Sequence, residues 1–519
     1  MNKKIIIIGA GPGGLQLAYY LEKNNMDYLI LERANHVGHT FEYFPRHRQL
    51  ISINKVYTGF DDNEINLRYD WNSLLSDEHA PLFKDYTKDY FPNADHIVNY
   101  FRDYAISHNL KIVYDAKVSN ISKEDLFRIE TENGYVYTCE KLVMAIGVNI
   151  PFIPKIKGIE NCKTYVDTSV DPEDFINKRV LIIGKGNSGF ETADNLVSTA
   201  SKIHVCSPTP IKLAWKTHFV GHLRAVNNNL LDTYQLKSQN AIIDGDIEEI
   251  KEIDGEYHVT VHYGHANNEV EVLIYDDVIL CAGFRFDDSM FADNTKPEMT
   301  IMNRFPNQKS NWESTNIDGL YFAGAVTQMR DFKKSTSAFI HGFRYNSKCL
   351  FHILNEDNNG VNWPSDSVSL NPEVITRKII ENVNRTSALW QQFGFIGDVI
   401  VIDNKKATYI HNIPVDYAID TYCQDKEHYF IVTLEYGHEI FNKSPDIFNV
   451  TRVHRNDVEN ANQSAFLHPI VREYINGLVV NVHHIIEDFE NNWKEEDVHI
   501  RPLKKFIYMC LKELVPLSL

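Results

Sequence analysis

Two short glycine-rich stretches carry the clearest chemistry in this sequence. They read GAGPGG at residues 9–14 and GKGNSG at residues 184–189. Glycines at this spacing let a chain turn sharply, approach a pyrophosphate closely and pack a helix against a strand, while the helix N-terminus offers free N–H groups to the anion. We therefore predict two dinucleotide sites, formed by Gly9, Gly11, Gly14, Gly184, Gly186, Asn187, Ser188 and Gly189.

The residue at the end of the following strand differs between the two turns. Glu32 ends the strand after the first turn, where a carboxylate can accept hydrogen bonds from ribose hydroxyls. The equivalent residue after the second turn is Ser207, whose neutral side chain leaves room for a 2′-phosphate that a carboxylate would repel. We therefore expect NADPH at the second site. Lys212 is the nearest cation for that phosphate, with an ordinary solvated lysine as the alternative.

The elements around each turn must hold it in place. Apolar strands precede both turns, amphipathic helices follow them, and second strands YLIL and KIHVCS close each unit, which predicts two Rossmann-like units. The strands KLVMAIG (141–147) and DDVILCAGF (276–284) end in small residues where the chain would cross between the units. LYFAGA (320–325) adds a strand, and we expect a helix from Ser335 with its N-terminal donors facing a flavin. This adds Gly147, Gly324 and Ser335 to the first site.

Two dinucleotide sites in one chain have a simple use. Enzymes that pass hydride from a nicotinamide to a flavin keep the flavin in place while the nicotinamide cofactor arrives and leaves. We therefore expect resident FAD in the first site and exchangeable NADPH in the second.

At these residues the chain resembles the two-dinucleotide flavoproteins that include flavin-containing and N-hydroxylating monooxygenases, because GAGPGG, GKGNSG and DDVILCAGF occur in that family's order. Longer blocks, such as YFPRHRQLISINKVYTG, FIHGFRY and FLHPIVREY, are similar to the FAD-dependent oxidoreductase domain family, which includes an endoplasmic-reticulum flavoprotein of protein quality control. This second resemblance covers nearly the whole chain. The monooxygenase fingerprint Phe-x-Gly-x-x-x-His is absent before the second turn, and Ala325 follows Gly324 where many such flavoproteins carry Asp.

The resemblance implies two catalytic side chains. Asn54, in LISINK, resembles the asparagine found early in flavin monooxygenases, and its amide would donate to the oxygens of a hydroperoxide at the flavin C4a atom. A structural role is the alternative. His341 lies in the FIHGFRY block and would relay protons, with a satisfied core histidine as the alternative.

Cationic and aromatic residues complete the predicted site. Arg46 and Arg48 would steady an anionic reduced flavin, or else lie in a solvated turn. Trp71 would form an aromatic wall of the pocket, or belong to the core. Arg224 would border the entry of the nicotinamide.

Composition excludes several classes of function. The chain has 519 residues and a net charge of -18, which repels nucleic acid and anionic lipid. No signal peptide or membrane span is predicted from the sequence, so we expect a cytoplasmic protein.

The seven cysteines are scattered, which argues against disulfides and a cysteine zinc site. His483 and His484 would point about 100° apart on a predicted helix, so we expect no metal site.

The predicted fold class is α/β, with two Rossmann-like domains, the second inserted in the first, and a C-terminal α+β extension. We assign residues 1–160 and 277–354 to the FAD domain, 161–276 to the NADPH domain, 355–373 to a linker and 374–519 to the extension. Within the extension, HYFIVTLEYG predicts a strand, and VVNVHHIIEDFENNW and PLKKFIYMCLKEL predict helices. The extension would cover the flavin site or form a homo-oligomer contact.

These features predict an FAD-containing, NADPH-dependent oxidoreductase. We expect a single-component monooxygenase that uses O2 and a C4a-(hydro)peroxyflavin on a small molecule, with halide capture, as in flavin halogenases, as a variant. One alternative is an NADPH-dependent disulfide reductase, against which the absence of a closely spaced cysteine pair counts. The other is a non-catalytic flavoprotein that acts as a binding partner in protein quality control.

Overall fold

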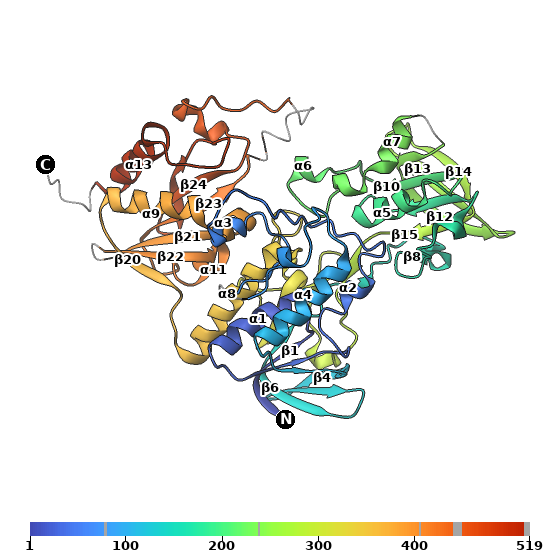
Figure 1. Ribbon diagram of the computed structural model, residues 1–519, viewed down its shortest axis with the longest axis horizontal. Helices are drawn as coiled ribbons and strands as arrows, with labels where there is room; N and C mark the ends of the chain where they lie inside the picture. The colour runs from blue at the N-terminus through green and yellow to red at the C-terminus, as the bar shows by residue number, and fades with distance from the viewer. Residues whose placement is uncertain (77–79, 237–238, 404–405, 438, 440–448, 513–519) are drawn as a thin grey trace.

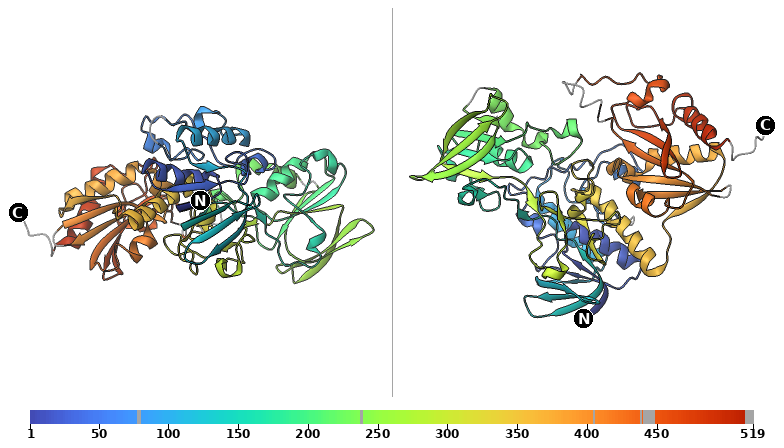
Figure 2. Two further views of the ribbon diagram at one scale, coloured as in Figure 1. Left: turned by 90° about the horizontal axis from the view of Figure 1, so that it is seen from below. Right: turned by 180° about the vertical axis from the view of Figure 1, so that it is seen from behind.

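The protein forms three lobes (Figure 1). The computed structural model describes residues 1–76, 80–236, 239–403, 406–437, 439 and 449–512. The first lobe lies between the second, drawn in green, and the third, drawn in orange and red, and the views in Figure 2 show the same arrangement. The predicted α/β class is confirmed. Among the described helices, none has both the length and the apolar character needed to span a bilayer.

A mostly parallel sheet forms the first lobe. Strand β1 (Asn2–Ile8) pairs in parallel with β2 (Tyr28–Leu31) on one side and with β6 (Val136–Met144) on the other. β19 (Leu320–Phe322) pairs in parallel with the end of β6. The four isoleucines of β1 are buried on both faces of the sheet, which explains their unbroken apolar run. Helices α1 (Pro12–Lys23) and α8 (Ile340–Asn359) pack together on this sheet (Figure 1).

The second lobe repeats this plan. β9 (Arg179–Ile183) leads into helix α5 (Asn187–Leu196) and then β10 (Lys202–Ser207), which pairs in parallel with β9. β15 (Asp277–Leu280) pairs with the other side of β9. The predicted boundary at residue 276 is therefore wrong, because residues 277–280 belong to the second sheet. An apolar strand pattern does not reveal which sheet the strand joins, and here the chain crosses back after the strand.

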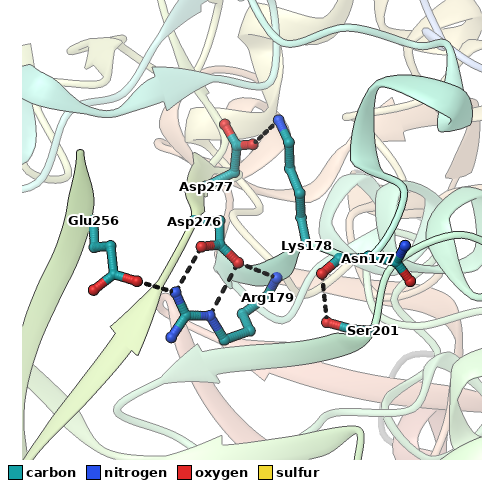
Figure 3. Close-up of polar contacts among 7 residues, drawn as sticks. All are labelled: Asn177, Lys178, Arg179, Ser201, Glu256, Asp276 and Asp277. Atoms are coloured by element: carbon teal, nitrogen blue, oxygen red, sulfur yellow. Dashed lines mark hydrogen bonds and ion pairs between the residues drawn. The ribbon is translucent and has the colours of Figure 1, made fainter.

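A charged network ties together the starting ends of β9 and β15 (Figure 3). Arg179 donates to both carboxylate oxygens of Asp276, at 2.6 and 3.0 Å, and to Glu256 at 2.6 Å. Lys178 pairs with Asp277 at 2.8 Å, and Ser201 donates to the carbonyl of Asn177. This end of the sheet lies opposite the glycine turn, so the network fixes strand pairing away from the nucleotide site.

The third lobe is a six-stranded antiparallel sheet in the order β20-β22-β21-β23-β24-β25. The strands are β20 (Ser365–Ser369), β21 (Ile396–Asp403), β22 (Lys406–Pro414), β23 (His428–Glu435), β24 (His468–Ile475) and β25 (Leu478–His484). Helices α9 (Pro372–Arg385) and α13 (Arg501–Leu511) pack against each other beside it. The predicted strand in HYFIVTLEYG and the predicted helix in PLKKFIYMCLKEL are confirmed by β23 and α13.

Two predictions for this region are wrong. The linker at 355–373 instead contains the end of α8 and strand β20, which pairs in register with β22. β20 is an edge strand with solvent on both faces, so its polar composition resembles that of a loop. The helix predicted over 479–493 instead begins as β25, the opposite edge strand, where His483 and His484 point to opposite faces.

Partly buried histidines make the fold sensitive to acid. Burial lowers the pKa to about 4 for His47, His204, His222, His352, His483 and His484. The pKa of histidine in the unfolded chain is about 6.5. Between pH 6.5 and 4 the unfolded chain therefore binds protons that the folded chain excludes, and the free energy of unfolding falls as the pH drops. Glu191 and Asp331 oppose this effect, because burial raises their pKa to about 7, but they are fewer.

We predict that the melting temperature falls between pH 7 and pH 5. Denaturant titrations over this range give the slope of the unfolding free energy against pH. For the His352→Gln variant this slope should be smaller, by the equivalent of about one bound proton. Equal slopes for the variant and the unaltered protein, or a melting temperature that rises toward pH 5, would contradict the prediction.

Candidate functional site

The first glycine turn is built by close contact of the backbone with itself. Gly9 has φ +103°, and a Cβ there would lie 2.8 Å from the carbonyl oxygen of Ala145 at the end of β6. A Cβ at Gly14 would overlap the carbonyl oxygen of Gly9. Gly11 is different, because no atom lies within 4 Å of its Cβ position. Two glycines therefore serve packing, and the third leaves open space at the N-terminus of α1.

The second turn has the same construction. Gly184 has φ +122°, and its Cβ would overlap the carbonyl oxygen of Cys281, just after β15. A Cβ at Gly189 would overlap the carbonyl of Gly184, whereas Gly186 again faces open space at the helix N-terminus. Ser188 lies in the first turn of α5, where its carbonyl accepts from Thr192. Both turns thus fit a pyrophosphate, which needs close approach and free N–H donors.

The strand ends beside the two turns differ as the sequence suggests. Glu32 is buried, and its carboxylate accepts from the N–H groups of Ala10 at 2.7 Å and Ala34 at 2.9 Å. It thereby braces the first turn. At the end of β10, the hydroxyl of Ser207 donates to the carbonyl of Thr209 at 3.1 Å, and Lys212 is exposed.

Lys185, which lies between the first two glycines of the second turn, was not singled out from the sequence. Its ammonium donates to the carbonyls of Ser207 and Thr209 and pairs with Asp244 of β11 (Ala241–Asp244). The side chain is only 4% exposed. A lysine within a glycine turn suggests a phosphate contact. Its ion pair with Asp244 could not be read from the sequence, because it depends on the pairing of β11 with β10.

The first turn also contacts helix α8 and the segment that follows β19. A Cβ at Gly13 would overlap the Cα of Gly324, which has φ +76°, and the hydroxyl of Ser347 donates to the carbonyl of Gly13 at 3.3 Å. Gly147, with φ +69°, has open space at its Cβ position. The site residues Gly147 and Gly324 therefore both follow strands of the first sheet, β6 and β19, near this turn.

The helix expected from Ser335 begins at Ile340 instead. The hydroxyl of Ser335 donates to the side-chain oxygen of Gln392 at 3.1 Å, and the N–H of Ser337 donates to Asp331. These polar groups are engaged by a residue of the third lobe and by a preceding loop, so the chain enters the helix later than its sequence suggests.

A stack of side chains joins the two nucleotide lobes. The guanidinium of Arg224 lies 5.1 Å from the ring centre of Trp71, a cation–π contact. Trp71 stacks on His341 at 4.4 Å between ring centres, and His341 in turn lies parallel to Phe339 at 5.8 Å. His341 is six residues before Ser347 on α8, hence about 9 Å along the helix axis from the contact with the first turn.

His341 is a buried base without a partner among the described residues. Its side chain is 1% exposed, and neither ring nitrogen has a hydrogen-bond partner. Burial, aided by the cations of Arg344 and Arg224, holds its pKa well below the usual range. The ring is therefore neutral at physiological pH, with one N–H donor and one acceptor nitrogen. The two ring nitrogens are therefore buried polar atoms that the described protein groups leave unsatisfied.

The second turn places Arg224. The amide of Asn187 donates to the carbonyls of Val220 at 3.2 Å and His222 at 2.7 Å, and its oxygen accepts from the N–H of Arg224 at 3.2 Å. Burial lowers the pKa of Arg224. The structure thus brings together Asn187, Arg224, Trp71 and His341, which come from distant parts of the sequence.

Three other predicted residues lie in polar networks of their own. Asn54 is buried, and its amide donates to the carbonyls of Thr87 at 2.9 Å and Asp89 at 3.4 Å. Arg46 donates to the carbonyls of Tyr165, Val166 and Thr168, which joins the first two lobes. Arg48 pairs with Asp95 at 2.6 Å and donates to Phe41. These contacts hold the loops around the site, and a direct role of the three side chains in chemistry stays a prediction.

The third lobe supplies contacts that no sequence motif indicated, and its role as a cover over the flavin site or as a homo-oligomer contact stays a prediction. Gln391 donates to the carbonyl of Arg68 at 2.7 Å, and Gln392 donates to the side chains of Asn346 at 2.6 Å and Ser337 at 2.9 Å. Tyr436 stacks flat on His218 of the second lobe at 3.7 Å. The largest apolar core is continuous through the first and third lobes. The glutamines belong to no motif, so the sequence offered no signal for them.

The thiols are poorly placed for redox exchange. All seven cysteines are free. Burial raises the pKa of Cys281, which follows β15, to about 12, and that of Cys349 on α8 to about 12. Thiolate is the form that attacks a disulfide, and these groups stay protonated at neutral pH.

Comparison with known proteins matches this geometry to flavoproteins. Residues 6–324 match the family model of pyridine nucleotide-disulphide oxidoreductases. The chain is 34% identical over 562 aligned positions to mouse FAD-dependent oxidoreductase domain-containing protein 2, across 98% of this chain and 84% of the relative. The zebrafish protein of the same name is 32% identical, across 99% of this chain and 84% of that protein.

Solved structures share the fold of the first two lobes. Bacillithiol disulfide reductase from Staphylococcus aureus superposes with a TM-score of 0.51 at 19% identity, covering 69% of this chain and 100% of that one. A flavin-containing monooxygenase from Stenotrophomonas maltophilia gives a TM-score of 0.51 at 17% identity, covering 69% and 99%. At these identities the likeness concerns the fold alone.

The two kinds of glycine in the first turn predict different outcomes for the same substitution. We expect Gly14→Ser to destabilise the cofactor-free protein by about 1–3 kcal/mol, because its side chain would overlap the Gly9 carbonyl. Gly11→Ser should leave the melting temperature nearly unchanged, since serine suits the N-cap of a helix and space is open. FAD titration should show weaker binding for both variants. Equal stability of the two variants would contradict this division.

Proposed function

Because the chain belongs to the pyridine nucleotide-disulphide oxidoreductase family, and within it to the FAD-dependent oxidoreductase domain-containing proteins, we propose that it is an NADPH-dependent flavin monooxygenase acting on a small molecule. The observation that supports this most is the stack of Arg224, Trp71 and His341 between the two glycine turns. It joins the lobe suited to a resident dinucleotide to the lobe suited to an exchanging one.

The residues of the first turn fit FAD. The N–H groups at the start of α1, with the open face of Gly11, would hold the pyrophosphate, and Glu32 lies where it can brace the turn and meet a ribose. Bound there, FAD would supply the ring that accepts hydride and then reduces oxygen. The protein's part would be to hold that ring in place and to keep water away from it.

The second turn would bind NADPH. Gly186 and the N-terminus of α5 would hold the pyrophosphate, and Ser207, without a carboxylate, leaves the 2′-phosphate unopposed. Two cations lie near the end of β10. Lys185 contacts the carbonyl of Ser207, and Lys212 follows Ser207 closely in the sequence. Asn187 fixes the segment from Val220 to Arg224, where Arg224 would meet the nicotinamide end of the cofactor.

His341 and Trp71 would act on the substrate side. A neutral, desolvated imidazole can donate a proton at one ring nitrogen and accept one at the other, which suits proton transfer as an oxygen atom is inserted. In this reaction one oxygen atom enters the substrate and the other leaves as water, with hydride supplied by NADPH and the proton by solvent. Trp71 and Phe339 pack against the imidazole and would help to exclude water from it.

A disulfide reductase with its own dithiol is less well supported. The sequence has no closely spaced cysteine pair, and burial raises the pKa of all seven cysteines, that of Cys281 to about 12. Halide capture stays a variant of the monooxygenase proposal.

NADPH consumption in air, measured with oxygen uptake, tests the proposal. Turnover only on addition of a low-molecular-weight disulfide would favour reductase chemistry, and the absence of any NADPH use would favour a non-catalytic flavoprotein.

We predict that Arg224→Gln lowers the anaerobic rate of flavin bleaching by NADPH about tenfold or more, because the cation over Trp71 positions the nicotinamide. The FAD content per chain should be unchanged, since Arg224 belongs to the second lobe. Stopped-flow absorbance measures the rate, and a variant that bleaches at the original rate would remove Arg224 from the proposed site.

The preference for NADPH over NADH should depend on Ser207. A carboxylate at this position in Ser207→Glu would repel the 2′-phosphate, and we expect the ratio of kcat/KM for NADPH over NADH to fall at least tenfold. The matched control is Ser201→Glu, just before the opposite end of β10, which should keep the original ratio (Figure 3). A ratio that moves equally in both variants would indicate a general effect of charge.

A further inference from the structure

Two histidines and a glutamate gather beside the first glycine turn. His36, His39 and Glu42 are spaced three residues apart, at the start of the short helix α2 (Thr40–Tyr43). One ligand atom from each lies within 4.8 Å of the other two. His36 Nε2 is 2.6 Å from Glu42 Oε1, and His39 Nδ1 is 3.4 Å from Glu42 Oε2. A helical turn brings residues three apart onto one face, which aligns His39 with Glu42.

This cluster is held rigidly on one side and open on the other. The N–H of Gly38 donates to the carbonyl of Ala10 in the first turn at 3.0 Å, which fixes the loop that carries both histidines. The histidine side chains are 17% and 25% exposed, and that of Glu42 is 39% exposed. The three side chains are therefore preorganised by the fold and partly exposed to solvent, while the Nδ1 atom of His39 is itself buried. His39 also borders a pocket of about 440 Å³ lined by Arg33 and Arg46.

The donor set selects a class of ion. Imidazole nitrogens with one carboxylate suit zinc, copper, nickel and iron, whereas magnesium and calcium prefer oxygen ligands. The two nearby arginines add positive charge, which disfavours ions held mainly by electrostatic attraction. An ion bound through strong bonds to imidazole tolerates that field better, and three protein ligands leave a fourth position open to water.

We propose that His36, His39 and Glu42 form a binding site for a divalent transition-metal ion, with zinc as the best match. The site uses the same loop that closes the first turn, but it requires no nucleotide. The spacing His-x-x-His-x-x-Glu lies apart from the cysteines and from the adjacent His483 and His484, for which the sequence predicts no metal site.

Zinc titration of the purified full-length protein tests the proposal. Calorimetry should detect one Zn²⁺ ion bound to the original protein. In His36→Ala and in His39→Ala the affinity for this ion should fall at least tenfold. Glu42→Gln keeps the shape of the side chain and should also weaken binding. The matched control is His265→Ala, an exposed histidine outside the cluster, which should keep the ion. Millimolar Mg²⁺ should not compete.

A second readout separates metal binding from loss of the fold. Added Zn²⁺ should raise the melting temperature of the original protein and of the His265 variant, because a ligand that binds only the folded state stabilises it. It should not raise that of the His39 variant, whose melting temperature without metal should match the original. If the histidine variants bind Zn²⁺ as the original protein does, or if no variant changes the melting response, the cluster is an ordinary set of ion pairs and the proposal is wrong.

Discussion

The whole arrangement depends on the close approach of the backbone to itself at two places. The carbonyl oxygens of Ala145 and Cys281 lie against Gly9 and Gly184, where no side chain fits. In the first lobe the end of β6 contacts the turn that follows the neighbouring strand β1. In the second lobe the end of β15 contacts the turn that follows β9. Because parallel strands end at the same edge of a sheet, this contact gathers a turn, a helix N-terminus and a crossing segment at each site.

The same constraint explains why one chain can bring two such sites together. The segments that follow Ala145 and Cys281 are the crossings between the lobes, so both lobes meet at the ends where their turns lie. Arg46 reinforces this junction through three carbonyls of the second lobe. The other ends of the strands carry ion pairs such as that of Arg179 with Asp276 (Figure 3).

Local signals in the sequence predicted the features that depend on local geometry. The glycine turns, β23 and α13 could be predicted because spacing and periodicity act over a few residues. The start of α8, the membership of β15 and the edge strands β20 and β25 could not, since each depends on a partner far along the chain. Among the site residues, Trp71 and His341 were named separately, but their stacking results from the packing of α8 and could not be read from either segment.

The third lobe shows why the site cannot be understood from the two nucleotide lobes alone. Gln392 bonds to Ser335 and Ser337 in the buried segment before α8 and to Asn346 within the helix, so it satisfies polar groups on both sides of the helix start. Those bonds fix the entry into the helix, and therefore the position of His341 six residues after Ser335. A neutral, unpartnered imidazole is costly to bury, so the surrounding structure must hold it strongly. The shared core of the first and third lobes provides that rigidity, which makes the third lobe a structural part of the site.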